Sequence, residues 1–139
     1  MSYEYYLQAC ENQAPQEIPT HKIVEIFEPY IVSRNTEFNY LDLVFDDLNH
    51  CSVYVDLGDP TTNGITISRP CGTEAMVRCM YEVMRLGYFV FFEPDGHGMI
   101  TLLPETEAHL LEGMVESLGT PAVASSWEEF YSLWENNRD

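Results

Sequence analysis

Two segments between residues 40 and 57, YLDLVFDD and CSVYVDL, alternate apolar and polar side chains and are joined by LNH. Alternation with period two places successive side chains on opposite faces of a β-strand. The two segments therefore predict a β-hairpin with one buried face. If residues 48–50 form the loop, Asp47 faces Cys51 and the apolar side chains share one face: Phe45 with Val53, Leu43 with Val55, and Leu41 with Leu57.

The polar face of this hairpin is a candidate binding surface. The same register places Asp42 opposite Asp56, Val44 opposite Tyr54 and Asp46 opposite Ser52. Two like charges directly opposite each other destabilise a sheet by about 0.2–1 kcal/mol, and an Arg or Lys of a bound partner would offset this cost.

We therefore expect the partner-binding surface to contain Asp42, Asp46, Tyr54 and Asp56, with Tyr54 as its aromatic anchor. Further candidates are four acids in or beside the predicted turns: Asp47, Asp59, Glu93 and Asp95. The alternative interpretation is that these acids solvate an edge strand and prevent strand-to-strand aggregation.

The rest of the chain predicts further strands and helices in a mixed order. Strands are expected at residues 3–9, 65–69, 88–92 and 98–104, with a short edge strand at 121–124. Helices are expected over residues 20–29, 73–86, 106–118 and from 126 onward, with N-caps at Thr20, Thr73 and Ser126.

This order of elements predicts an α+β fold. We expect a mainly antiparallel sheet that contains a β-meander, with about four helices packed chiefly on one face. The continuously apolar segment YFVFF (88–92) is expected to be central and buried on both faces, and the hairpin 40–57 to lie nearer an edge.

A chain of 139 residues is about the size of one domain, so residues 1–139 are expected to form a single globular domain. The composition, 45% apolar and 13% aromatic, supplies a core and excludes intrinsic disorder. The opening MSYEYYLQAC lacks the basic and apolar parts of a signal peptide, and no apolar run reaches the ~20 residues of a membrane span. We therefore expect a cytoplasmic protein.

The formal net charge is −17, from 23 acidic and six basic residues. Nucleic-acid binding requires Lys and Arg that displace counterions from phosphates, so nucleic acid is excluded as a partner, and anionic membrane surfaces are excluded for the same reason. The charge serves solubility, or it attracts a basic protein partner.

The four cysteines, Cys10, Cys51, Cys71 and Cys79, show no C-x-x-C spacing, and free thiols in a reducing compartment are expected. Cys71 stands in RPCGTE, before a predicted helix and near Arg69, and both features lower a thiol pKa. Cys71 is therefore the candidate nucleophile of an alternative function. His97, in the glycine-flanked turn PDGHG, is either a functional loop residue or a solvated turn residue.

Motifs for metals and cofactors are missing: the chain has no H-x-x-x-H pair, EF-hand loop, Walker loop or G-x-G-x-x-G run. We expect no metal and no cofactor. One alternative is a Mg²⁺ or Ca²⁺ site built from Asp42, Asp46 and Asp56, because these ions prefer carboxylate oxygens.

Four segments, MSYEYY, NGITISRPCGTEAM, RLGYFVFFEPDG and GTPAVASSWEEF, resemble those of small bacterial proteins of unassigned activity. In general character the chain is similar to the immunity proteins of bacterial toxin systems, which are small, acidic α+β domains that plug a toxin. The resemblance implies a non-enzymatic, acidic protein-binding module, an inhibitor or immunity-type protein that neutralises a basic partner such as a toxin. The alternatives are a small cytosolic thiol-dependent enzyme centred on Cys71, and a structural homo-oligomer. The binding module is expected to be a monomer or homodimer.

Overall fold

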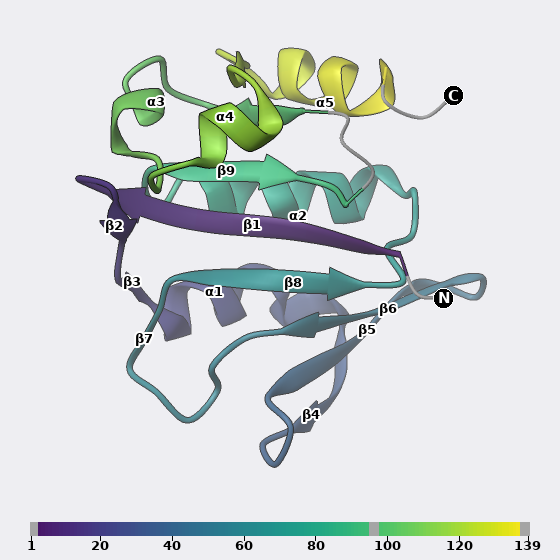
Figure 1. Ribbon diagram of the computed structural model, residues 1–139. Coiled ribbons are helices and arrows are strands. Elements are labelled where there is room, and N and C mark those ends of the chain that lie inside the picture. Colours follow the sequence, from purple (N-terminus) through teal and green to yellow (C-terminus); the bar gives the residue numbers. More distant parts are fainter. Residues whose placement is uncertain (1–2, 95–97, 137–139) are drawn as a thin grey trace.

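A mixed β-sheet runs through the centre of the molecule (Figure 1). The computed structural model describes residues 3–94 and 98–136. From one edge to the other, the sheet contains β11 (Ala122–Val123), β10 (Met99–Thr101), β9 (Phe89–Phe92), β1 (Glu4–Glu11), β8 (Gly64–Ser68), β6 (Asn49–Tyr54), β5 (Tyr40–Asp46) and β4 (Ile31–Asn35). The short strand β2 (Ala14–Pro15) pairs with β1, and β3 (Ile18–Pro19) pairs separately with β7 (Thr61–Thr62). These pairs are antiparallel except β10 with β11.

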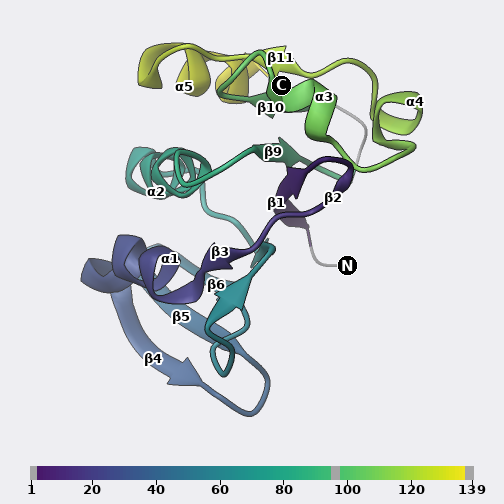
Figure 2. The ribbon, with the colours of Figure 1, turned by 90° about the vertical axis from the view of Figure 1, so that its left-hand side faces the viewer.

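Helices cover the two faces of the sheet unequally. The three longer helices, α1 (Thr20–Phe27), α2 (Glu74–Met84) and α5 (Trp127–Asn136), lie along one face, and the 3₁₀ turn η1 (Glu28–Tyr30) follows α1 (Figure 2). The short helices α3 (Thr106–His109) and α4 (Met114–Leu118) lie on the other face, beside β9 and β10. The α+β class and the mainly antiparallel sheet are confirmed, and the sheet is larger than the predicted meander.

The prediction of one helix over residues 106–118 is wrong. Leu110 ends α3 in an extended conformation (φ −61°, ψ 151°), and Gly113, before α4, has a φ of +89°. Neither conformation continues an α-helix, and the positive φ favours glycine. The segment therefore forms two short helices, and the described residues contain five helices instead of about four.

Two of the three predicted N-caps are confirmed. Thr73 accepts a hydrogen bond from a backbone N–H in the first turn of α2 at 3.2 Å, and Ser126 accepts one from the N–H of Glu129 at 3.2 Å. Thr20 does not cap α1, because it is the first residue of that helix and Pro19 occupies the N-cap position.

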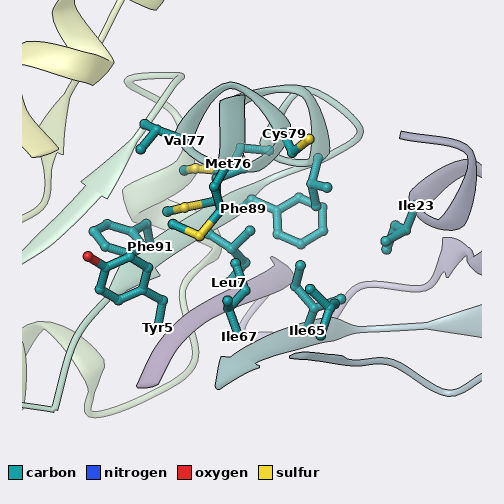
Figure 3. Packing of buried hydrophobic residues seen from close by; sticks show 14 of the residues in the cluster. Tyr5, Leu7, Ile23, Ile65, Ile67, Met76, Val77, Cys79, Phe89 and Phe91 are labelled. Carbon is teal, nitrogen blue, oxygen red and sulfur yellow. The ribbon is translucent and has the colours of Figure 1, made fainter. Parts of the chain in front are cut away.

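The main hydrophobic core lies between the sheet and the three longer helices. Figure 3 shows Tyr5 and Leu7 of β1, Ile67 of β8 and Phe91 of β9 gathered below Met76 of α2. The three methionines of α2 are at most 1% exposed. The apolar stripe of α2 is therefore a packing face and not a surface groove.

A second, smaller cluster lies on the other face of the sheet, where α4 packs against Cys10 of β1, Val90 of β9, Met99 of β10 and Leu110 at the end of α3. Val90 faces this cluster, whereas Phe89 and Phe91 face the main core. Strand β9 is therefore buried on both faces, as its continuous apolar run predicts.

The hairpin at residues 40–57 forms, but the predicted register is wrong. Leu41 pairs with Val53 and Asp42 with Ser52, so Asp42 does not face Asp56. Relative to the prediction, the partners of the β5 residues before the β-bulge, 40–44, move by four positions. Because this shift is even, the apolar face of the hairpin stays buried.

The turn of the hairpin accounts for the different register. The carboxylate of Asp46 accepts hydrogen bonds from the N–H of Leu48 (2.9 Å) and from the side chain of Asn49 (2.8 Å). These bonds close a two-residue turn at 47–48 in place of the predicted loop at 48–50, and a β-bulge between Val44 and Asp46 accommodates it. The edge beyond β5 is occupied by β4, a strand that the sequence analysis did not predict.

Candidate functional site on the open face of the sheet

The face of the sheet opposite α1 and α2 is uncovered over β5, β6 and β8, because α3 and α4 pack beside β9 and β10. Figure 1 looks onto this open face. Tyr54 is 42% exposed there, and Tyr6, Tyr40, Thr66 and Phe92 are partly exposed. The open face therefore presents aromatic side chains to solvent, where a monomeric protein rarely keeps a contiguous apolar patch.

Five residues form a line that crosses the open face and continues over β1 to β9, one on each of five neighbouring strands. Strand pairing aligns them in the order Tyr40, Tyr54, Thr66, Tyr6 and Phe92. The ring centroids of Tyr40 and Tyr54 are 5.3 Å apart, and the rings of Tyr6 and Phe92 stack at 5.2 Å. We call these five residues the aromatic row. Such cross-strand ring pairs stabilise a sheet and also supply rigid contact area for a partner.

A second line of residues, two positions along each strand, carries carboxylates and hydroxyls. Strand pairing aligns Ser33, Asp42, Ser52, Ser68 and Glu4 in that order, and we call them the acidic row. Asp42 accepts hydrogen bonds from the hydroxyls of Ser33 (2.6 Å) and Ser52 (3.3 Å). The acidic row therefore holds its Asp42 carboxylate in a defined position beside the rings.

Tyr6 connects the two rows. Its hydroxyl donates a hydrogen bond to the carboxylate of Glu4 at 3.0 Å, and this bond, with the desolvation and negative charge around it, raises the pKa of Tyr6. The phenol therefore stays protonated and neutral at physiological pH. The hydrogen bond places the Glu4 carboxyl group at the border of the aromatic row.

A groove of about 450 Å³ opens in the middle of the aromatic row. Thr66 lies between Tyr54 and Tyr6, so a small side chain separates the two aromatic pairs, and Gly64, two positions along β8, also lines the groove. Asp56 and Phe38 also line this groove, and Phe38, in the connection before β5, is 64% exposed. The groove combines ring faces with a carboxylate.

The structure brings three of the four principal predicted residues to this region. Asp42 lies in the acidic row, Tyr54 in the aromatic row, and Asp56 lines the groove while accepting a hydrogen bond from the Thr62 hydroxyl at 3.0 Å. Asp46 lies apart in the hairpin turn, where the N–H of Leu48 and the Asn49 side chain lower its pKa. The repulsion between Asp42 and Asp56 on which the prediction relied does not exist.

The second group of predicted acids is scattered. Glu93 is 2% exposed and its carboxylate accepts a hydrogen bond from the Tyr3 hydroxyl, so it is a buried residue and not a surface contact. Asp47 is exposed in the hairpin turn, and Asp59 is exposed beside α1, away from the open face. Asp95, like His97, lies outside the described residues.

The sequence analysis missed Tyr6, Tyr40, Thr66 and Phe92 as site residues. The partial alternation of YEYYL places Tyr6 on the face opposite Tyr5 and Leu7, and that signal was available. The alignment of these residues in one row could not be predicted, because it depends on the order and register of five strands.

Cys71 lies in the connection between β8 and α2, and its thiol faces the core. Its Sγ atom is 3.8 Å from Sδ of Met76 and 4.0 Å from the hydroxyl of Thr73, and the residue is 9% exposed. A hydrogen bond from the Cys51 thiol, with further bonds from Thr73, lowers the pKa of Cys71 and raises the pKa of Cys51. The predicted direction is therefore confirmed, but its main cause is the neighbouring thiol and not Arg69.

Burial is expected to keep Cys71 unreactive despite its lowered pKa. We expect native Cys71 to react with iodoacetamide at pH 6.5 no faster than glutathione does, because alkylation requires access to the sulfur as well as a thiolate. Peptide mass spectrometry would measure the labelling, with the urea-unfolded chain as the control in which all four cysteines react. Faster labelling of native Cys71 would support the thiol-enzyme alternative.

Within residues 3–94 and 98–136, no group of three or more His, Cys, Asp or Glu side chains is placed to hold a metal ion. Asp42, Asp46 and Asp56 therefore do not form the alternative cation site. None of the helices in the described part of the chain has the length and apolar character needed to cross a membrane.

Comparisons of this chain with protein-family models, with curated proteins and with solved structures gave no match.

Proposed function

We propose that the protein is a non-enzymatic binding module that holds a basic protein partner against the open face of its sheet, in the manner of an inhibitor or immunity-type protein. The observation that carries this proposal is the aromatic row beside the acidic row on an uncovered sheet face. Interfaces are enriched in tyrosine, and their energetic centres combine aromatic anchors with charged pairs.

The charge of the whole chain supports a basic partner. With a net charge of −17, the protein attracts cations over its entire surface and repels other polyanions. Such complementarity speeds association and makes it dependent on salt concentration. A second copy of this chain is a poor occupant of the open face, because it would bring another −17 to the interface.

Tyr54 offers a direct test of this surface, since it is exposed and lies in the aromatic row. The full-length protein would be used as bait in a lysate of its source cells at about 50 mM salt, and captured proteins identified by mass spectrometry. We expect a basic partner whose affinity decreases more than about tenfold for Tyr54→Ala, measured by titration calorimetry.

Leu103→Ala is the matched control, because Leu103 is 40% exposed, nearly the same as Tyr54, and lies after β10, away from the groove. We expect this variant to bind within about twofold of the wild type. The proposal is overturned if the captured partner is acidic, if Tyr54→Ala binds it as the wild type does, or if size-exclusion chromatography shows a wild-type dimer that Tyr54→Ala converts to a monomer.

A further inference from the structure

The aromatic row is interrupted at its centre by a small residue. Tyr40 and Tyr54 form one ring pair and Tyr6 and Phe92 the other, and Thr66 of β8 lies between the two pairs. Thr66, Tyr54 and Tyr6 all line the groove of about 450 Å³, with Gly64 also in its lining. Tyr54 and Tyr6 therefore form two aromatic walls, and Thr66 forms the floor between them.

Acidic side chains lie at two places around this groove. Asp56 lines the groove itself, and Glu4 is hydrogen bonded to the hydroxyl of Tyr6, one of the two walls. Among the described residues that line the groove there is no Lys or Arg. The groove therefore offers ring faces and acidic groups, and no basic side chain among its described lining residues competes with a bound cation.

We propose that this groove is an arginine-binding slot, which takes a guanidinium group of the basic partner between Tyr54 and Tyr6. A guanidinium group is planar, stacks on aromatic faces and pairs with carboxylates through parallel N–H donors. The inference rests on the proposed function, and it names the chemical group by which the partner is held.

The chain's own Arg78 shows the same chemistry on another surface. Its guanidinium lies over the rings of Tyr81 (5.3 Å to the centroid) and Trp127 (5.0 Å). It also pairs with the carboxylate of Glu82 at 3.0 Å. Two rings and one carboxylate are therefore sufficient partners for one arginine in this protein, and the slot supplies the same set.

Other occupants match the slot less well. A lysine ammonium is a compact, strongly hydrated charge that gains less from stacking than a guanidinium does. An apolar side chain would leave Asp56 without a counter-charge. The base of a nucleotide would stack between the rings, but the phosphates of the nucleotide would meet a chain with a net charge of −17.

Two short peptides test the slot in the full-length protein: acetyl-Gly-Arg-Gly-amide and its counterpart with lysine in place of arginine. Each would be titrated at about 50 mM salt while amide signals are followed by NMR. We expect the arginine peptide to shift the signals of Tyr6, Tyr54 and Thr66 saturably, with an affinity about fivefold above that of the lysine peptide.

Thr66→Leu fills the floor of the slot without changing any charge, and we expect it to weaken the arginine peptide about tenfold. Thr36→Leu, an exposed threonine that does not line the slot, is the matched control and should bind as the wild type does. If Thr66→Leu does not fold, Tyr54→Ala removes one wall at an exposed position and should reduce arginine binding similarly.

Equal binding of the two peptides, or signal shifts spread over all the acidic residues, overturns the slot. If this occurs while the captured partner still depends on Tyr54, the slot is wrong and the proposed function stands. If the arginine peptide binds the slot but the captured partner is insensitive to both Tyr54→Ala and Thr66→Leu, the slot stands and the proposed function is wrong.

Discussion

Replacing Phe91 with alanine is expected to lower the free energy of unfolding by about 3–5 kcal/mol. Phe91 is fully buried in β9, and its ring lies edge-on to Tyr5 at 5.2 Å and to Phe130 at 6.3 Å. It therefore joins β9, β1 and α5 in the main core. Its loss would leave a cavity that rigid neighbours on both sides cannot fill, and a typical domain has only about 5–15 kcal/mol of stability in total.

The next residue in the chain is the control for this prediction. Phe92 points to the opposite face, where it is partly exposed, stacks on Tyr6 and borders the smaller cluster. We expect Phe92→Ala to cost about 1–2 kcal/mol of stability, because it loses one ring pair and only partial burial. Urea unfolding followed by tryptophan fluorescence would measure both variants. Equal losses would contradict the assignment of the two rings to opposite faces of β9.

Replacing Gly64 with alanine is expected to lower the free energy of unfolding by about 3 kcal/mol. Gly64 pairs with Gln8 where β8 meets β1, and a Cβ atom at this position would lie 2.5 Å from the carbonyl oxygen of Leu7. That oxygen belongs to the backbone, so it cannot move away by changing a rotamer. The strands β1 and β8 would have to separate locally, beneath the groove of the open face.

Gly58→Ala is the matched control, because a Cβ atom at Gly58 meets no atom within 4 Å. We expect it to change stability by less than about 0.5 kcal/mol. Urea unfolding would compare the two variants, and amide NMR signals of Tyr6 and Thr66 would report a local separation of the strands. If Gly64→Ala were as stable as Gly58→Ala, the close approach of β8 to Leu7 would be wrong.

The candidate site was predicted in part, and for a reason that proved incorrect. The alternation around Asp42 and Tyr54 placed both residues on the polar face of a hairpin, and both lie on the open face. The expected repulsion between Asp42 and Asp56 does not occur, because Asp42 faces Ser52. Periodicity defines which face a side chain occupies, whereas an even shift in register leaves the faces unchanged and so cannot be detected from alternation.

Glu93 shows a different limit of sequence reasoning. Its position in the EPDG segment is typical of an exposed turn. The carboxylate is buried instead, and the hydroxyl of Tyr3, near the N-terminus, donates a hydrogen bond that offsets the cost of burying it. Such a partner is 90 residues away in sequence, so no local pattern contains it.

By itself the sequence determined the properties that depend on neighbouring residues. Period two in 40–57 determined the buried face of the hairpin, Thr73 and Ser126 determined where two helices begin, and the excess of acids determined the net charge. Only the tertiary structure decided the order and register of the strands, because these depend on backbone pairing and core packing between segments far apart in the chain. The aromatic row, with Tyr40, Tyr54, Thr66, Tyr6 and Phe92 on five different strands, exists solely through that pairing.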